Sequence, residues 1–390
     1  MEASSGLQAE DHGIVIVGGG PVGLYLGCRL AASSTPVTVL ERRSRRAAES
    51  RAIGIHPPAL ELLAEVGVAS AMVSRGVKVL RGLAFSDRSP IGAADFSKLP
   101  PPYRFVLTLP QADTEELLEE RLAALAPKAL QRGVAVSSVV GRSDQVTLAC
   151  DSQLGRRIIT ARLVVGCDGA QSLVRRAMGV AFAGGPYPDR YLMGDTVDTT
   201  RWHDAAAVFF SRAGVVESFP LPHGRRRWVV KTDGRSHDNS HDTLVQTLAS
   251  EVPRRTGYEF PAGECSFVSA FGVYRHVASR MVAHRLALAG DAAHVVSPIG
   301  GQGMNLGWLD AADLARALAA DGSSDGGDKR LHQYDRRRRR AAKRAVRRAR
   351  FHTLLGRATR LPWARDAVVK AMLSRWLHAN TLARFTLRGL

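Results

Sequence analysis

The stretch GIVIVGGGPVGLYLGCRLAASSTPVTVLERR (residues 13–43) contains two apolar runs separated by a glycine-rich turn and a helix-like segment. Gly18, Gly20 and Gly23 give the turn the spacing GxGxxG, and the second apolar run ends in Glu41. In a strand–turn–helix–strand unit these glycines allow a tight turn, the approach of a pyrophosphate and close helix packing, and the terminal acid binds a ribose. The stretch therefore predicts an α/β fold with a Rossmann-like domain that binds a dinucleotide.

Two later segments have the pattern of further strands in the same sheet. RLVVGCDG (162–169) and RLALAGD (285–291) are apolar runs that end in an acid at a glycine turn, Asp168 and Asp291. Ligands of parallel sheets bind beyond the carboxyl ends of the strands, so these acids can reach the ligand of the first glycine turn. A contact so far along the chain favours FAD, a longer cofactor, over NAD.

The loop GDAAHVVSPIGGQGMNLG (290–307) has five glycines and few long side chains. Such a loop predicts that its backbone, not its side chains, contacts a ligand. A helix-like segment follows, and the amide groups of a helix N-terminus stabilise negative charge.

Together these motifs resemble the class A FAD-dependent monooxygenases of the para-hydroxybenzoate hydroxylase superfamily. The resemblance covers roughly residues 13–350 and includes SRAIGIHPPALELL (50–63) and LPQADTEELLEERL (109–122). It implies that Arg51 and Gln111 contact FAD, that Asp291 binds cofactor hydroxyls, and that Asp168 serves the pyrophosphate and the incoming nicotinamide. The residues expected to bind FAD, without a covalent link, are Gly18, Gly20, Pro21, Val22, Gly23, Glu41, Arg42, Arg51, Gln111, Asp168, Gly290, Asp291, Pro298, Gly301, Gly303, Met304 and Asn305.

The chain is expected to comprise an FAD-binding domain in two parts (1–182 and 280–328), an inserted β-rich substrate domain (183–279) and a basic helical C-terminal segment (329–390). AAAVFFSR (205–212), GVVESFPL (214–221) and RRRWVVKT (225–232) read as antiparallel strands separated by turns. In the resembled family such a sheet roofs the substrate pocket. Phe210, Phe219 and Trp228 are the candidate pocket residues, although ordinary core packing also accounts for each.

The resemblance implies that NADPH or NADH reduces FAD and leaves, after which O2 forms a flavin hydroperoxide that hydroxylates an electron-rich ring. The catalytic residue is not identified by sequence. His56, Tyr274 and His276 are candidates for a base, but a structural role is the favoured interpretation of each of them, as it is of His294. An alkene reductase or epoxidase of the same fold, and a non-catalytic flavin-binding protein, remain alternatives.

The expected substrate is a lipophilic phenol. The strands that would cover it are apolar and aromatic, and no Arg or Lys stands out as a clamp for a small carboxylate. No C-terminal thioredoxin-like domain, such as larger aromatic hydroxylases carry, is expected in a chain of this length. In these respects it resembles hydroxylases of ubiquinone biosynthesis and of phenolic lipids in secondary metabolism.

Positive charge is concentrated at the C-terminus. Residues 329–390 hold 19 of the 54 Lys and Arg residues but only two acids, Asp335 and Asp366. In YDRRRRRAAKRAVRRAR (334–350) a row of arginines lies opposite an apolar strip of alanines and Val346; the arginines are Arg336, Arg340, Arg344 and Arg348. This segment is either the solvated face of a packed helix or an attachment to an anionic phospholipid surface.

Other classes of partner are not indicated. No nucleic-acid-binding module accompanies the basic run, and no cluster of metal ligands is apparent. The four cysteines lack paired spacing, and the apolar run after Gly13 is too short and too broken by glycine for a membrane span. We expect a cytoplasmic protein, with peripheral attachment to a membrane left open.

Overall fold

The computed structural model describes residues 10–46, 51–232, 240–319, 324–374 and 377–390. Its first sheet contains five parallel strands in the order β18 (Leu286–Leu288), β11 (Gly155–Gly166), β1 (Glu10–Val17), β2 (Val37–Glu41) and β8 (Leu130–Arg132). The short β17 (Val282–Ala283) pairs with β18, and β10 (Val146–Ser152) and β9 (Ala135–Gly141) extend the sheet from β11 in antiparallel fashion. The predicted strands before Glu41, Asp168 and Asp291 are therefore confirmed, and their carboxyl ends meet at one edge.

Helices cover the parallel sheet because its strands are apolar on both faces. Helix α1 (Pro21–Ala32) starts directly after the glycine turn and packs against α4 (Gln111–Leu125) and α7 (Gln302–Ala319). Trp308 of α7 is fully buried, and its indole N–H donates a 2.9 Å hydrogen bond to the carbonyl of Pro21. Smaller helices complete this half of the molecule: α2 (Pro57–Glu65), α3 (Ala69–Arg75) and α5 (Leu173–Ala177).

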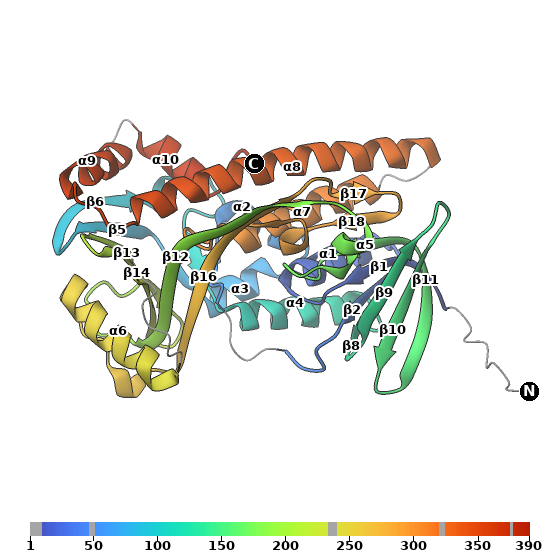
Figure 1. The fold of residues 1–390 in the computed structure, drawn as a ribbon, viewed down its shortest axis with the longest axis horizontal. Coiled ribbons are helices and arrows are strands. Elements are labelled where there is room, and N and C mark those ends of the chain that lie inside the picture. The colour runs from blue at the N-terminus through green and yellow to red at the C-terminus, as the bar shows by residue number, and fades with distance from the viewer. Residues whose placement is uncertain (1–9, 47–50, 233–239, 320–323, 375–376) are drawn as a thin grey trace, which may run out of the picture.

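A second sheet, mostly antiparallel, lies beside the first (Figure 1). Its strand order is β19 (His294–Val295), β16 (Phe267–Ala278), β12 (Phe182–Val197), β15 (Arg225–Thr232), β14 (Gly214–Leu221), β13 (Ala206–Ser211), β5 (Arg81–Ser86) and β6 (Ser89–Asp95). The segment 183–279 thus supplies most of this sheet, and 81–95 supplies two further strands. Helix α6 (His241–Thr256) packs on one face, so the other face is available to a ligand.

A small three-stranded sheet connects the two halves. It consists of β3 (Gly54–Ile55), β7 (Val106–Thr108) and β4 (Val77–Val79). The hydroxyl of Thr108 donates a 2.7 Å hydrogen bond to the carbonyl of Pro220 in β14, which fixes this small sheet to the second sheet.

The C-terminal segment is a long helix followed by two short ones: α8 (Ser324–Leu355), α9 (Pro362–Leu373) and α10 (His378–Phe385). Helix α8 runs along the molecule, and α9 and α10 lie over the second sheet near β5 and β6 (Figure 1). The predicted small-residue strip packs against the body, since Ala341, Ala342, Ala345 and Ala349 are buried. Among the described helices, none combines the length and the apolar character needed to cross a bilayer.

Part of the basic run is used inside the fold. Arg338 is buried and forms a 2.7 Å ion pair with Asp310 of α7, while Arg337 pairs with Asp313 at 2.9 Å. Of the predicted arginine row, Arg336, Arg340 and Arg344 are exposed, whereas Arg348 is half-buried. The row is therefore a solvent-exposed basic face at three of its four positions.

Candidate functional site

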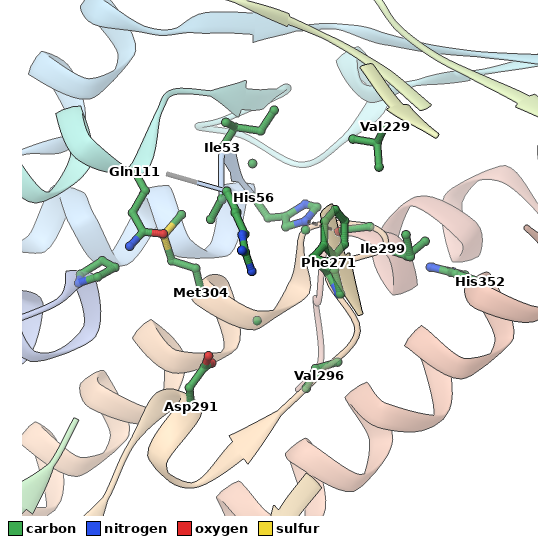
Figure 2. A pocket seen from close by; sticks show the side chains of 18 of the residues that line it. Ile53, His56, Gln111, Val229, Phe271, Asp291, Val296, Ile299, Met304 and His352 are labelled. Atoms are coloured by element: carbon green, nitrogen blue, oxygen red, sulfur yellow. Dashed lines mark hydrogen bonds between the residues drawn. The ribbon is translucent and has the colours of Figure 1, made fainter. Parts of the chain in front are cut away.

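One cavity of about 1780 Å³ extends from the carboxyl edge of the parallel sheet to the inner face of the second sheet. Figure 2 shows part of it, with Gln111, Met304 and Asp291 on one side and Val229, Phe271 and His352 on the other. The following residues expected to bind the cofactor line it: Gly18, Gly20, Pro21, Val22, Glu41, Arg42, Arg51, Gln111, Asp168, Asp291, Pro298, Gly301, Gly303 and Met304. Gly23, Gly290 and Asn305 do not line the cavity.

The glycine turn has three different steric environments. Gly18 has φ = 109°, and a Cβ there would lie 2.4 Å from the carbonyl oxygen of Cys167. At Gly23 a Cβ would lie 1.9 Å from the oxygen of Gly18, so the helix could not pack. At Gly20 a Cβ would meet no heavy atom within 4 Å, which leaves open space beside the start of α1. Free amide groups at this helix N-terminus, which has no side-chain cap, suit a pyrophosphate.

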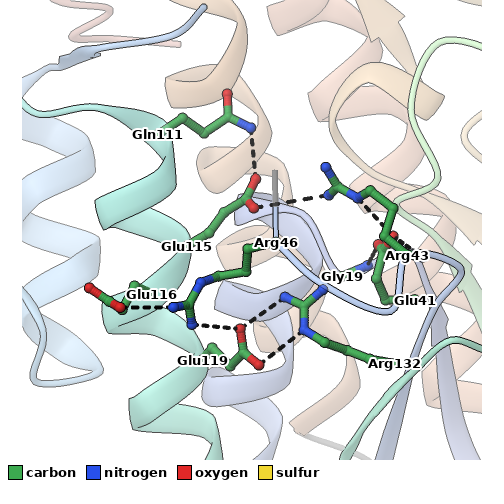
Figure 3. Close-up of polar contacts among 9 residues, drawn as sticks. All are labelled: Gly19, Glu41, Arg43, Arg46, Gln111, Glu115, Glu116, Glu119 and Arg132. Carbon is green, nitrogen blue, oxygen red and sulfur yellow. Dashed lines mark hydrogen bonds and ion pairs between the residues drawn. The ribbon is translucent and has the colours of Figure 1, made fainter. Parts of the chain in front are cut away.

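Glu41 ends β2 within a network of polar contacts (Figure 3). Its carboxylate accepts hydrogen bonds from the backbone N–H of Gly19 (2.8 Å) and of Arg43 (2.9 Å), and from the Arg43 guanidinium (3.0 Å). Burial opposes ionisation, but these hydrogen bonds hold the pKa of Glu41 below its usual value. An anionic acceptor is therefore fixed beside the glycine turn.

A second buried carboxylate, Glu115, lies close to Glu41 in the cavity lining. Burial raises its pKa, and its carboxylate accepts a 2.8 Å hydrogen bond from the side-chain amide of Gln111. Neither Glu115 nor Arg43 was predicted from sequence. Glu115 follows Gln111 by one helical turn in α4, so the predicted Gln111 could have indicated it.

The two downstream acids also face the cavity. One oxygen of Asp168 accepts hydrogen bonds from the backbone N–H groups of Leu173 (2.6 Å) and Val174 (3.2 Å), which orients the turn before α5. Its other oxygen is buried and has no hydrogen-bond partner among the described residues. Asp291 projects into the cavity, where enclosure by the protein raises its pKa. Both acids are thus placed to accept hydrogen bonds from a ligand.

Side chains brace the glycine-rich loop from behind. The Asn305 carbonyl oxygen accepts a 2.8 Å hydrogen bond from the backbone N–H of His56, and its amide donates to the carbonyls of Gly54 (2.9 Å) and Gly301 (2.7 Å). The side chain of Asn305 thereby ties the loop to β3. Gly303, at the start of α7, lines the cavity, and a Cβ there would meet nothing within 4 Å.

Of the three candidate bases, only His56 lines the cavity. Its Nε2 lies 3.0 Å from the carbonyl of Gly300, and burial, assisted by the nearby His352, lowers its pKa to about 4. It is therefore neutral at physiological pH. Tyr274 and His276 lie outside the cavity, because β16 leaves it after Gly272 and pairs with residues 184–186 of β12.

His294 has a structural role, which was the interpretation that the sequence favoured. It is fully buried, and its Nε2 bonds to Asp310, not to Asp291. Asp310 also accepts from the backbone N–H of Gly290 (3.1 Å) and from Arg338. This network fixes the start of the loop.

Strand alternation decides which residues of the second sheet face the cavity. Phe210 and Phe219 line it, as predicted from sequence. Trp228 does not: it is buried on the opposite face, against α6, while its neighbours Arg227 and Val229 face the cavity. The sequence of β15 shows no polar–apolar alternation that distinguishes its faces, since both are buried.

The C-terminal helices also contribute to the cavity, which was not predicted from the sequence. Residues of α8, α9 and α10 line its far end, among them Phe351, His352, Leu373, Leu382 and Phe385. Arg365 of α9 holds this wall in place by donating hydrogen bonds to the carbonyls of Phe210 (2.7 Å) and Ser211 (2.9 Å). Contacts over such sequence separations leave no local pattern.

Comparison with known proteins agrees with this geometry. Residues 11–349 match the family described as FAD binding domain. The chain is 33% identical over 311 residues to rifampicin monooxygenase of Streptomyces venezuelae, covering 79% of this chain and 64% of the relative. It is also 33% identical over 315 residues to 6-methylpretetramide 4-monooxygenase of Streptomyces rimosus, covering 80% of this chain and 56% of the relative. The chain thus spans less than two thirds of the length of these relatives.

The fold also matches a solved structure over nearly its whole length. The p-nitrophenol 4-monooxygenase PnpA of Pseudomonas putida DLL-E4 superposes with a TM-score of 0.89 at 25% identity, covering 98% of this chain and 99% of that one. The two-sheet architecture with its C-terminal helices is therefore shared with an aromatic monooxygenase. The chain belongs to the FAD binding domain family, that of the class A flavoprotein monooxygenases of para-hydroxybenzoate hydroxylase type.

Proposed function

We propose that this protein is an FAD-dependent monooxygenase that uses NAD(P)H and O2 to hydroxylate an aromatic, lipophilic substrate. The observation that carries the proposal is the continuity of the cavity, which has dinucleotide-type features at one end and an apolar sheet face at the other. FAD is long enough to extend from the glycine turn to the loop after Pro298, leaving the sheet face for a substrate.

The residues at the first end suit FAD. Glu41 would accept hydrogen bonds from the adenosine ribose, and the open space at Gly20 would admit the pyrophosphate. Asp291, and the unpartnered oxygen of Asp168, would accept hydrogen bonds from cofactor hydroxyls. The backbone around Gly303 and Met304, at the start of α7, would meet negative charge on the reduced flavin ring.

Bound FAD would supply the redox chemistry that side chains lack, namely activation of O2 after reduction by NAD(P)H. The protein contributes orientation and exclusion of water. An apolar cluster around Met193, Val215, Val229 and Ile299 surrounds the substrate end, where it would shield the reacting atoms from solvent.

The substrate class follows from the same surface. Phe210, Phe219 and Phe271 add aromatic area to the apolar lining, which favours fused rings or a hydrophobic chain. Each buried methylene adds at most about 0.8 kcal/mol of binding free energy. Named relatives are monooxygenases of rifampicin and 6-methylpretetramide, which supports a bulky aromatic substrate.

The experiment is a panel of phenols with increasing ring number and alkyl chain length, compared with para-hydroxybenzoate. The purified protein should be yellow, with about one FAD per chain, and larger lipophilic phenols should stimulate NAD(P)H oxidation most. A preference for the small carboxylate would contradict the proposed substrate class. A protein that cannot be loaded with FAD would contradict the proposed function as a whole.

We further propose that the exposed arginines of α8 attach the protein peripherally to an anionic membrane surface in the cytoplasm. Arg336, Arg340 and Arg344 support this, together with exposed Trp363 of α9. Substituting the three arginines with Gln should weaken co-sedimentation with vesicles that contain phosphatidylserine, as should added salt, since charges are screened beyond about 10 Å at 0.1 M. Binding that ignores both changes would exclude an electrostatic attachment.

A further inference from the structure

Glu217 is a buried acid on the cavity face of the second sheet. In β14 the side chains of Val215, Glu217 and Phe219 line the cavity, while Val216 and Ser218 face the opposite side. Glu217 is only 8% exposed. No described residue forms a hydrogen bond or ion pair with its carboxylate, so the structure contains no internal partner for this charge within its described part.

The surroundings of Glu217 are apolar. Its register neighbours on the adjacent strands are Val208 of β13 and Val229 of β15, and both line the cavity. A carboxylate buried without a partner is unfavourable, and burial raises the pKa of Glu217 to about 7. A hydrophobic residue would suit this position better if it served only for packing.

Glu217 also lies at the substrate end of the cavity. Val229, its neighbour across the sheet, faces Phe271 and Ile299 in Figure 2, and Ile299 belongs to the glycine-rich loop. The other acids in the cavity lining, Glu41, Glu115, Asp168 and Asp291, come from the half of the protein that contains the parallel sheet. Glu217 is thus the acid that the second sheet contributes to the described lining.

We propose that the Glu217 carboxylate accepts the hydrogen bond, and during reaction the proton, of a phenolic hydroxyl on the substrate. This rests on the proposed function. It adds a carboxylate of the second sheet to His56, which alone of the three candidates from sequence lines the cavity. A phenol that loses its proton is a more electron-rich ring and reacts faster with an electrophilic oxygen. The inference also narrows the substrate class to aromatic rings that carry a free hydroxyl.

The step balances with the proposed reactants. The phenolic O–H bond breaks, its proton moves to a Glu217 oxygen, and its electron pair enters the ring as a ring carbon forms a C–O bond to one atom of O2 and the O–O bond breaks. The attacked carbon then loses its hydrogen as a proton, and the phenolic oxygen recovers its own proton from Glu217. NAD(P)H supplies a hydride, which carries the two electrons. Together with the ring proton and one proton from solvent, this hydride provides the hydrogen of the new hydroxyl and the two hydrogens of the water that takes the second oxygen atom.

The other ionisable groups around Glu217 do not compete for this role. Tyr191 of β12 has a buried hydroxyl, and its pKa is raised by burial and by the Glu217 charge, so it stays neutral. Arg227 of β15 forms a 2.7 Å ion pair with Asp195, and Lys231 lies 3.7 Å from Asp189, which also pairs with Arg357 at 2.7 Å. His352 of α8, also in the lining, is neutral because burial lowers its pKa to about 4. From β13 only apolar side chains, such as Val208, face the cavity.

The test compares binding of 2-naphthol and its methyl ether, 2-methoxynaphthalene, to the FAD-loaded protein by fluorescence. The wild type should prefer the naphthol, and the preference should grow from about pH 5.5 to about pH 8, because the carboxylate ionises around pH 7. In Glu217→Leu the affinity ratio of naphthol to methyl ether should fall roughly tenfold or more, since a hydrogen bond to a charged acceptor is lost. In Glu217→Gln this ratio should no longer depend on pH, and in Glu217→Asp part of the pH dependence should remain. Glu264→Gln, the same change at an exposed acid, is the control.

Stability provides a second readout. Glu217→Leu should melt no lower than the wild type, because it removes an unpartnered buried charge. Strong destabilisation of this variant would assign Glu217 a structural role and overturn the proposal. The proposal would also be overturned if the wild type showed no preference for the naphthol. This holds both when the two compounds bind equally and when neither binds. If labelled oxygen enters a phenol but the variants keep the wild-type pH profile, only the role of Glu217 fails; if no oxygen is incorporated, the proposed function fails.

Discussion

At the scale of single residues, two glycines of the first turn have different roles, one in binding the cofactor and one in folding. A methyl group at Gly20 would meet no protein atom, whereas one at Gly23 would overlap the carbonyl of Gly18. Gly20→Ala should therefore fold and melt normally but bind FAD roughly tenfold or more weakly, because the methyl group occupies the space proposed for the pyrophosphate. Gly23→Ala should lose stability as well as FAD. Flavin absorbance and thermal melting distinguish the two; unchanged FAD affinity in Gly20→Ala would move the phosphate site elsewhere.

Buried His56 gives the protein a defined sensitivity to acid. Its pKa is lowered to about 4, below the ordinary value of about 6.5. Between those values the unfolded chain takes up a proton that the folded protein does not, so the free energy of unfolding falls as pH falls, by roughly 3 kcal/mol at most. His56→Gln, which can still donate to Gly300, should show a smaller drop in melting temperature between about pH 7 and about pH 5. Identical drops would mean that His56 is protonated in the folded protein.

The site residues that could be predicted are those that the local spacing of glycines and acids identifies. The glycines of the first turn and the acids Glu41, Asp168 and Asp291 all follow strands, and the structure places them at one sheet edge. Trp228 could not be assigned to a face, since both faces of its strand are buried. Glu217 was overlooked, although an acid within the apolar run GVVESFPL was the available signal.

At the scale of elements, the attachment of α8 depends on a buried charge network. Arg338 pairs with Asp310, which also bonds to His294 at the start of the glycine-rich loop. Removing one partner of a buried ion pair costs roughly 3–5 kcal/mol. Arg338→Met should thus lower the melting temperature strongly, whereas Arg336→Met, on the exposed side of the same helix, should change stability by about 0.5 kcal/mol or less. Equal effects of the two substitutions would show that the pair contributes little.

The strands of the second sheet were largely predictable, because short β-type runs alternate with turn residues. The strands β13, β14 and β15 appear where those runs and the turns between them indicated strands. The pairing of β13 with β5 was not predictable, since it joins residues more than a hundred positions apart in parallel.

At the scale of the whole molecule, the C-terminal segment has a role that its composition concealed. Its arginine content suggested a surface feature, yet α8, α9 and α10 close the far end of the cavity. Leu382 and Phe385 pack with Phe96 and Phe219, which come from distant parts of the chain. Only the folded structure places these residues together, so the size and shape of the substrate site could not be inferred from sequence.

In the proposed reaction, the bound flavin and the adjoining apolar space together insert oxygen into an aromatic ring. The decisive measurement supplies the FAD-loaded protein with NAD(P)H, ¹⁸O2 and the phenol that best stimulates NAD(P)H oxidation, and analyses the product by mass spectrometry. We expect a ring-hydroxylated product that carries one ¹⁸O atom. A product without the label, or flavin turnover that never modifies the phenol, would contradict the proposed reaction.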